Sequence, residues 1–350
     1  MLALRKTAPA PGLVLQDVAE PGRPEAGEVL IEVAAAGICG SDVHVYDWTD
    51  GYAFMSSRLP VTLGHEFCGR IAAVGPEVSG LAEGDLVAPI PTIGCMRCTD
   101  CAAGFPQRCN FRRTVGLTRD GAFARFVRVP ALSCVKLHPG TDPVLAALLE
   151  PLCVGDNAAN VGDVHFGDVV LVLGPGTIGQ AIARAASWRG AAQVVVAGMN
   201  DTARLATALQ VGATDTLDLA LFSNLRSAFL ALTNGREADV VFEATGHPAS
   251  IADGLSVLRK DGVLVSAGIH ATPAQIDLTA LVRNRQQLRG AHASRRPSWE
   301  IMARRLIEMP EQVRPFVSLQ LGLEDAIGGF ERSRARDVSK VVLRPGGVPA

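Results

Sequence analysis

The run GPGTIG at residues 174–179 constrains the fold more than any other feature of this sequence. It follows directly on the apolar run VVLVL, and a helical pattern begins near Thr177, so the motif is expected at a strand-to-helix turn. Gly174, Gly176 and Gly179 have the GxGxxG spacing, which permits a tight turn and lets a pyrophosphate approach a helix N-terminus. A purely structural turn can carry the same glycines, so the surrounding sequence pattern must distinguish a nucleotide-binding turn from a structural one.

That pattern is an alternation of strands and helices. AQVVVAG, ADVVFEATG and VLVSAGI are valine-rich runs separated by stretches of helical periodicity. Nearly continuous apolar strands linked by helices predict an α/β fold whose doubly wound parallel sheet is covered on both faces. The sequence therefore predicts a Rossmann dinucleotide-binding domain over residues 156–293.

The first third of the chain has a different sequence pattern. EVLIEVAAAGI, FCGRIAAVG, DLVAPI and ARFVRVP are short apolar or alternating runs, punctuated by Gly, Pro and Asp, which predict a β-rich domain. The last 50 or so residues lose the strand–helix alternation and contain a further strand at VSKVVLRP. Because 350 residues are long for one core, we predict two domains, the first formed by residues 1–155 and completed by 294–350.

The composition excludes several classes of partner. Charged residues make up 19% of the chain and the formal net charge is −2, without the basic stripe that nucleic acid or an anionic membrane requires. The N-terminal residues lack the apolar core of a secretion signal, and no apolar run approaches the length of a membrane span. We expect a cytoplasmic protein that binds neither nucleic acid nor a membrane.

Four of the eight cysteines are crowded into GCMRCTDCAAGFPQRC. Cys95, Cys98, Cys101 and Cys109 have the spacing C-x2-C-x2-C-x7-C, and four thiolates satisfy tetrahedral zinc without an open position for substrate. The sequence thus predicts a structural zinc site. An iron–sulfur cluster is the competing interpretation, because ferredoxins also space three cysteines in this way.

A second group of metal-ligand types lies in GICGSDVH at 37–44 and GHE at 64–66. Together with the four-cysteine run, LEP at 149–151 and GPGTIG, these motifs resemble the zinc-dependent medium-chain alcohol dehydrogenases, most closely the polyol (sorbitol) and threonine dehydrogenase branch. The resemblance covers nearly the whole chain. It implies a GroES-like catalytic domain followed by the Rossmann domain, with the active site in the cleft between them.

The resemblance also implies roles for individual residues. Cys39 and His65 would be ligands of a catalytic zinc, joined by Glu66 and Glu150, of which one is expected to exchange with water or substrate. A catalytic zinc keeps an open position, so four permanent ligands would close the site. Cys68 and Cys153 are expected to be buried filler rather than ligands.

Other residues are expected to serve the chemistry around the metal. Ser41 is similar to the family's first proton-relay hydroxyl, His44 would be the exit to solvent, and Asp42 would orient the His65 ring. Trp48 and Arg295 are candidates for substrate contact. Threonine dehydrogenases are expected to have a histidine where this chain has Thr92, which favours a polyol or another vicinal diol.

The cofactor residues follow from the glycine motif and the resemblance. An acidic residue about 20 positions after the motif should bind the NAD ribose, but Gly198 and Met199 stand there and Asp201 comes slightly late. Arg204 is the one nearby cation, and Asp201 would repel a 2′-phosphate, so we expect NAD rather than NADP. The expected cofactor contacts are Gly174, Gly176, Thr177, Ile178, Gly179, Asn200, Asp201, Arg204, Thr245 and Ile269.

The predicted function is hydride transfer between a nicotinamide cofactor and a secondary alcohol such as a polyol, sugar alcohol or vicinal diol. The protein would carry two zinc ions per chain and form a homotetramer or homodimer. Three alternatives stay open: an L-threonine 3-dehydrogenase-like enzyme, a ketone or aldehyde reductase using NADP, and a non-enzymatic cofactor-binding protein.

Overall fold

The computed structural model describes residues 1–347 and divides them into two compact units. The first unit comprises Met1–Glu150, Arg295–Pro310 and the chain from Val317 onward, and the second comprises Pro151–Ser294 with Glu311–Phe316. The division falls inside a helix, α4 (Leu149–Gly162). Each unit is described by itself below.

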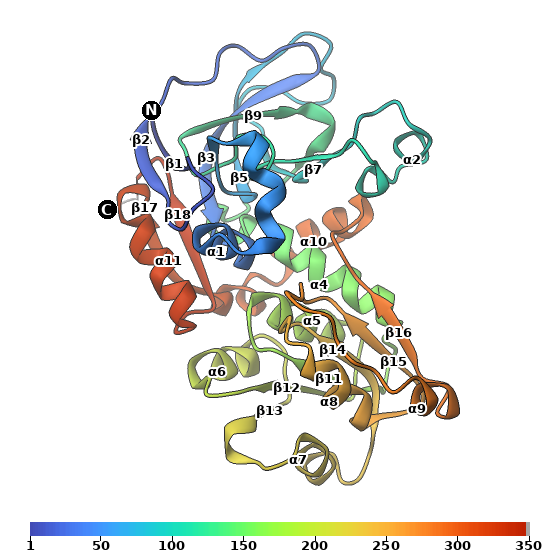
Figure 1. Ribbon diagram of the computed structural model, residues 1–350. Coiled ribbons are helices and arrows are strands. Elements are labelled where there is room, and N and C mark those ends of the chain that lie inside the picture. The colour runs from blue at the N-terminus through green and yellow to red at the C-terminus, as the bar shows by residue number, and fades with distance from the viewer. Residues whose placement is uncertain (348–350) are drawn as a thin grey trace. The chain divides into compact units, whose positions relative to one another are not determined.

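The first unit is built on β-sheets (Figure 1). Within the described residues, its largest sheet has seven strands in the order β10-β6-β5-β3-β18-β17, with β9 also pairing with β3. A three-stranded sheet has the order β2-β1-β4, and β7 pairs with β8. The strands are β1 (Leu2–Lys6), β2 (Val14–Asp17), β3 (Glu28–Gly37), β4 (Val61–Thr62), β5 (Glu66–Val74), β6 (Leu86–Pro89), β7 (Thr92–Ile93), β8 (Arg113–Thr114), β9 (Phe126–Pro130), β10 (Cys134–Lys136), β17 (Val317–Gly322) and β18 (Lys340–Arg344).

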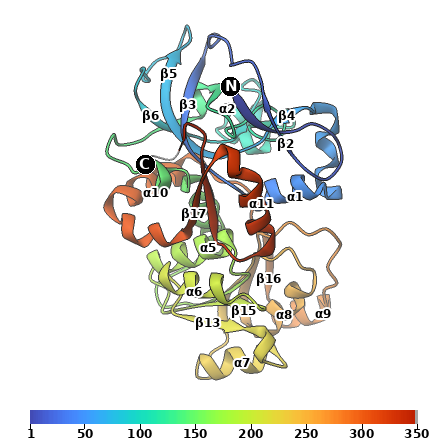
Figure 2. The same cartoon turned by 90° about the vertical axis from the view of Figure 1, so that its left-hand side faces the viewer.

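The C-terminal part of the chain belongs to this sheet because β18 pairs antiparallel with β3. Figure 2 shows α11 beside β17, where Phe330 of the helix enters the core of the unit. Alternate residues of β3, among them Val29, Ile31 and Val33, enter the same core, as expected for a strand with a period of two. The helices of the unit are α1 (Gly40–Asp47), α2 (Thr99–Ala102), α3 (Pro143–Ala146), α10 (Arg296–Glu308) and α11 (Ala326–Ala335).

The second unit contains a parallel sheet of six strands within the described residues. Its order is β13-β12-β11-β14-β15-β16, so that β11, the first strand along the chain, lies in the middle and the chain winds outward in both directions. The strands are β11 (Val169–Leu173), β12 (Gln193–Gly198), β13 (Asp215–Asp218), β14 (Ala238–Glu243), β15 (Leu258–Ser266) and β16 (Gln287–Gly290).

Helices cover both faces of this sheet (Figure 1). Val170 and Val172 of β11 pack in one cluster with residues of α4, α5 and α6, whereas Val169 and Leu171 pack in another with α7 and α8. This alternation buries every side chain of β11, which is why its sequence reads as one apolar run. The helices are α5 (Thr177–Trp188), α6 (Thr202–Gln210), α7 (Leu225–Leu232), α8 (Ala249–Val257) and α9 (Leu278–Arg283). Among the described residues, no helix has the length and apolar character needed to cross a membrane.

Candidate metal centres and cofactor turn

The GHE stretch forms a tight turn that leads into β5. Gly64 has φ +95°, and a Cβ at this position would lie 2.5 Å from the Phe123 ring, so only glycine fits without a shift. His65 and Glu66 follow, both buried, and Glu66 begins the strand opposite Gly37 of β3. A Cβ on Gly37 would meet the Glu66 carboxylate at 2.3 Å, so this second glycine makes room for it.

Cys39 lies at the N-cap of α1, directly after β3. The Asp42 carboxylate Oδ2 accepts a hydrogen bond of 3.0 Å from the Cys39 backbone nitrogen, which holds the first turn of the helix in place. The other oxygen, Oδ1, lies 3.6 Å from His65 Nδ1. Asp42 is fully buried, so its charge acts on both candidate ligands at once.

The ligand atoms of Cys39, His65 and Glu66 lie within 4.8 Å of one another. Burial alone would lower the pKa of His65, but the negative charges of Asp42 and Cys39 outweigh it and raise the pKa well above the ordinary value. A thiol, an imidazole and a carboxylate therefore converge from α1 and from the turn before β5. The sequence predicted this meeting, and the structure brings the three side chains together.

Lys340 is a functional candidate that the sequence did not indicate. Its ammonium lies 2.6 Å from Glu66 Oε2 and donates a hydrogen bond of 2.9 Å to the backbone oxygen of Ile38. Burial lowers the pKa of Lys340, but the Glu66 charge more than compensates and the pKa is raised. The buried pair leaves Glu66 Oε1 without a hydrogen-bond partner in the described chain. The one available signal was a lysine inside the apolar run VSKVVLRP.

Glu150 lies farther from the other candidate zinc ligands than the sequence suggested. It belongs to the first turn of α4 and is partly buried, but it is not among the side chains whose ligand atoms lie within 4.8 Å of one another. Burial raises the pKa of Glu150 to about 7, with His65 opposing the shift and Glu66 adding to it. The structure therefore places Glu150 within electrostatic reach of the cluster.

The donor set fits a zinc ion. Sulfur, nitrogen and carboxylate oxygen are the ligands that zinc accepts, and three protein ligands leave a fourth position open. Glu66 Oε1, a buried acceptor without a partner in residues 1–347, is the kind of atom that a cation would satisfy. Cys68 and Cys153 lie outside the cluster: both are buried, and the Cys68 thiol donates to the backbone oxygen of Pro143.

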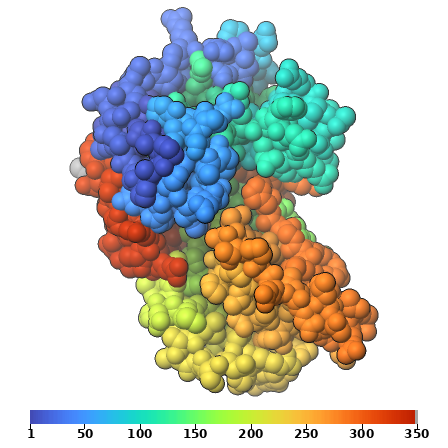
Figure 3. Space-filling model, in the orientation of Figure 1, coloured from blue at the N-terminus to red at the C-terminus, as the bar shows by residue number. Residues whose placement is uncertain are grey.

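The four predicted lobe cysteines also converge. The sulfurs of Cys95, Cys98, Cys101 and Cys109 lie within 4.8 Å of one another, and all eight cysteines of the chain are free of disulfides. Cys109 Sγ accepts hydrogen bonds from the backbone nitrogens of Cys95 and Phe111. A Cβ on Gly94 would lie 2.4 Å from Cys101 Sγ, so the turn before the lobe requires glycine. Figure 3 shows the lobe protruding from the first unit.

Helix α1 carries both predicted relay residues. Ser41 Oγ lies 3.3 Å from His65 Nε2, which places the hydroxyl beside the candidate metal ligands. His44 follows three residues later on the same helix face, is exposed, and stacks on Tyr52 with ring centroids 5.8 Å apart. Burial raises the pKa of Tyr52 to about 12, so its phenol stays protonated at neutral pH.

The two predicted substrate residues contact protein groups. Trp48 ends α1 in a left-handed conformation, packs against the core of the unit and lies 5.0 Å below the Lys6 ammonium. Arg295 is exposed, and its guanidinium lies 4.7 Å from the Phe105 ring of the lobe. These contacts anchor both side chains and leave their role toward a substrate a prediction.

The glycine motif has the geometry that its spacing implies. Gly174 ends β11 with φ +107°, Gly176 is the N-cap of α5, and a Cβ on Gly179 would lie 1.8 Å from the Gly174 carbonyl oxygen. The first turn of the helix therefore packs directly on the strand end, and Thr177 and Ile178 supply the first backbone N–H groups of α5. Such a turn is a ready site for a phosphate group.

Asp201 and Arg204 form an ion pair next to this turn. Arg204 Nε donates to Asp201 Oδ1 at 2.7 Å, and its Nη2 donates to the other carboxylate oxygen. Arg204 Nη1 would lie 3.6 Å from a Cβ on Gly176, so the guanidinium is beside the glycine motif. Asn200, with φ +53°, donates from its backbone nitrogen to Asp218.

Thr245 and Ile269 lie on two neighbouring loops that one buried carboxylate ties together. Glu243, at the end of β14, accepts hydrogen bonds from the backbone nitrogens of Thr245 and Gly246 and lies 2.9 Å from His270 Nε2. Ile269 is 61% exposed, and its carbonyl oxygen would touch a Cβ on Gly246. The sequence did not single out Glu243 or His270; the signal was an acidic residue interrupting the apolar strand ADVVFE.

Two family models match the chain. The alcohol dehydrogenase GroES-like domain matches residues 25–139, and the zinc-binding dehydrogenase model matches residues 177–308. The first lies in the sheet-rich unit that holds both cysteine sites. The second begins at the glycine turn of the parallel-sheet unit.

Individual relatives agree with the family models. The chain is 34% identical to the L-threonine 3-dehydrogenase of Bacillus licheniformis and 31% identical to the sorbitol dehydrogenase of Halalkalibacterium halodurans, in both cases over 99% of each chain. The structure is similar to that of 2R,3R-butanediol dehydrogenase from Bacillus subtilis, with a TM-score of 0.86, 25% identity, and coverage of 98% of this chain and 99% of the other. The chain therefore belongs to the zinc-dependent medium-chain alcohol dehydrogenases, in the branch of the polyol and threonine dehydrogenases.

Proposed function

We propose that this dehydrogenase transfers a hydride between a secondary alcohol and NAD at a zinc ion held by Cys39, His65 and Glu66. The observation that carries the proposal is the convergence of these three ligand atoms, with Glu66 Oε1 buried and unpartnered among residues 1–347. Cys95, Cys98, Cys101 and Cys109 would hold a second, structural zinc ion. Glu150 would be the exchangeable ligand, because its carboxyl belongs to the same electrostatic cluster without joining the close group.

A zinc ion in this site would supply Lewis acidity, which lowers the pKa of an alcohol hydroxyl and so favours hydride loss from its carbon. The protein residues would orient the ligands and balance their charges. Asp42 Oδ1 faces His65 Nδ1 at 3.6 Å and attracts the ring electrostatically, and Lys340 holds one oxygen of Glu66 while leaving the other free. Glu66 can thus contribute a ligand without bringing an uncompensated second charge into a buried site.

A path for the proton runs along α1. Ser41 Oγ is close enough to the metal ligands to accept the proton of a bound hydroxyl, and His44 is exposed on the same face of the helix. A histidine suits the exit because its ordinary pKa of about 6.5 permits exchange with water at neutral pH. This route needs no charged group inside the site other than the metal ligands and Asp42.

The relatives suggest the substrate class. L-Threonine, sorbitol and 2R,3R-butanediol share a secondary hydroxyl next to a carbon that bears another hydroxyl or an amino group. We therefore propose a vicinal diol or polyol, with L-threonine as the second candidate because the relative that is 34% identical acts on it.

NAD is the proposed cofactor because, among residues 1–347, the end of β12 offers no free cation for a 2′-phosphate. Arg204, the cation beside the glycine turn, is already paired with Asp201. A phosphate at this position would have to displace that carboxylate and then lie next to it.

The test is to measure metal content and turnover together. The protein is expected to contain two zinc ions per chain and to reduce NAD in the presence of 2,3-butanediol or sorbitol more efficiently than in the presence of threonine. Preference for NADP would refute the cofactor assignment, and preference for threonine would establish the second candidate. Two zinc ions without turnover of any alcohol would refute the enzymatic proposal and leave a cofactor-binding protein.

A further inference from the structure

The first unit contains a cavity of about 620 Å³ whose lining includes five arginines and three carboxylates. Its size is that of a small-molecule site, for which volumes of about 300–1,000 Å³ are usual. Its lining includes none of the residues proposed to bind zinc or the nicotinamide cofactor. The charged lining residues are Arg5, Arg58, Arg113, Arg119, Arg128, Glu25, Glu28 and Asp120.

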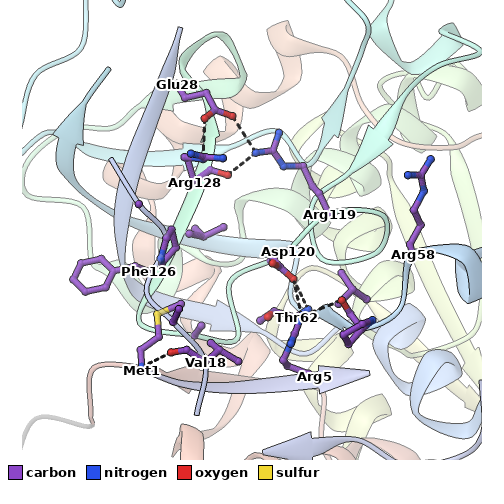
Figure 4. Close-up of a pocket in the computed structure, with 18 of the residues that line it drawn as sticks. Met1, Arg5, Val18, Glu28, Arg58, Thr62, Arg119, Asp120, Phe126 and Arg128 are labelled. Atoms are coloured by element: carbon purple, nitrogen blue, oxygen red, sulfur yellow. Dashed lines mark hydrogen bonds and ion pairs between the residues drawn. The ribbon is translucent and has the colours of Figure 1, made fainter. Parts of the chain in front are cut away.

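The acidic residues neutralise only part of this positive charge. Glu28 accepts from both Arg119 and Arg128, at 3.3 and 2.9 Å, so one carboxylate serves two guanidinium groups (Figure 4). Glu25 lies 3.3 Å from Arg128 and adds a second carboxylate at the same end. This end of the cavity is close to electrical balance.

The other arginines of the lining are less completely neutralised. Arg5 lies 3.7 Å from Asp120 and donates to the backbone oxygen of Pro60, while its Nε is buried without a partner in residues 1–347. Arg58, the last residue of the 3₁₀ helix η1 (Asp50–Arg58), and Arg113 of β8 are both exposed and have no ion-pair partner in that part of the chain. With five arginines against three carboxylates, the lining side chains have an excess of two positive charges.

The cavity also has a side with apolar side chains, where the Met1 ammonium donates to the backbone oxygen of Val18. In Figure 4, Met1, Val18 and Phe126 lie on one side, and Arg58 and Arg119 lie on the other. A guanidinium group presents a planar set of N–H donors that matches the oxygens of a phosphate. The arrangement suits a ligand with a doubly charged phosphate at one end and an uncharged body.

We propose that this cavity is a second ligand site that binds a phosphate-bearing small molecule through Arg58 and Arg113, with Arg5 and Arg119 as further donors of the same lining. The site goes beyond the dehydrogenase reaction, because its residues are separate from those that would hold zinc and cofactor. Its floor is nevertheless joined to the metal site: Asp120 and Gly121 bond the backbone of Thr62, three residues before His65.

The test is calorimetric titration of the zinc-loaded protein with inorganic pyrophosphate and with inorganic phosphate, at constant ionic strength. The double variant Arg58→Ala/Arg113→Ala should bind pyrophosphate about a hundredfold more weakly than the unmodified protein, since each of the two lost charge-assisted bonds is worth about a tenfold change in affinity. The matched control is Arg283→Ala/Arg304→Ala, which removes two exposed arginines outside the cavity and should change the affinity less than about twofold.

A third variant, Arg58→Lys/Arg113→Lys, keeps the charge without the guanidinium geometry and should bind with intermediate affinity. Equal pyrophosphate affinity of the alanine variant and the unmodified protein would overturn the proposal, because the ligand would then bind elsewhere, for instance at the glycine turn. Absence of any binding at millimolar pyrophosphate would overturn it too. If the alanine variant instead changed the oligomeric state in sedimentation, the arginines would belong to a protein interface.

Discussion

The two candidate metal centres of the first unit are built in opposite ways. The lobe takes its four candidate ligands from fifteen consecutive residues, Cys95 to Cys109, on α2 and the chain around it. The Cys39 centre takes its ligands from a helix N-cap and a strand start, and fixes them with Lys340 from the other end of the chain. A local site can form wherever its turns form, whereas the distant one exists only once β3, β5 and β18 have paired.

The largest expected effect separates the two centres by function. Cys39→Ser should reduce turnover to background and lower the zinc content from two ions per chain to one, because a serine hydroxyl is a poor zinc ligand. Metal analysis and initial rates measure both. Cys68→Ser, at a buried cysteine outside the cluster, is the control and should keep both zinc ions and most of the activity. Retained activity in Cys39→Ser would refute the assignment of this centre.

The next effect tests how the distant centre depends on the fold. Lys340→Met leaves the Glu66 carboxylate buried without its partner, which should cost about 3–5 kcal/mol in the free energy of unfolding. Denaturant unfolding of the zinc-free protein measures it. The control is Lys136→Met, because the exposed pair of Lys136 with Asp85 should contribute at most about 1 kcal/mol. Equal losses of unfolding free energy in the two variants would show that the buried pair stabilises the protein no more than the exposed pair does.

A smaller effect is expected from the lobe. Cys98→Ser should remove the lobe zinc and leave the Cys39 centre loaded, because the lobe ligands share no side chain with that centre. The variant should show one zinc ion per chain and new protease cleavage between residues 95 and 109, with nearly unchanged unfolding of the rest. Loss of both zinc ions would mean that the two centres are coupled.

The smallest effect is a difference in thiol reactivity. After zinc removal by a chelator, an alkylating reagent should modify the partly exposed Cys95 and Cys98, while Cys68 and Cys134 stay unmodified. Burial raises the pKa of both buried thiols to about 12, so they hold their protons even at pH 9, and only the thiolate reacts. Peptide mass mapping at pH 7 and pH 9 measures the order in which the cysteines are alkylated. Early modification of Cys68 would contradict its placement in the core.

Most of the architecture could be predicted from the sequence because the patterns that indicate strands, helices and turns involve residues close together in the chain. The valine-rich run before GPGTIG implied a strand buried on both faces, and the structure gives β11 that place in the middle of a parallel sheet. The lobe cysteines were recognisable from spacing alone. The sequence predicted that Asp201 and Arg204 lie near the cofactor, but it did not predict their ion pair. That pairing depends on the first turn of α6.

By itself, the sequence determined the α/β and β-rich halves, the local four-cysteine lobe and the glycine turn, since each of these depends on residues close together in the chain. Only the tertiary structure decided that Glu66 meets Lys340, that Glu243 ties two loops together, and that arginines from β1, η1 and β8 line one cavity. The physical reason is that a buried charge is defined by the partners that folding brings to it. Glu66 and Lys340, for example, lie 274 residues apart in the chain.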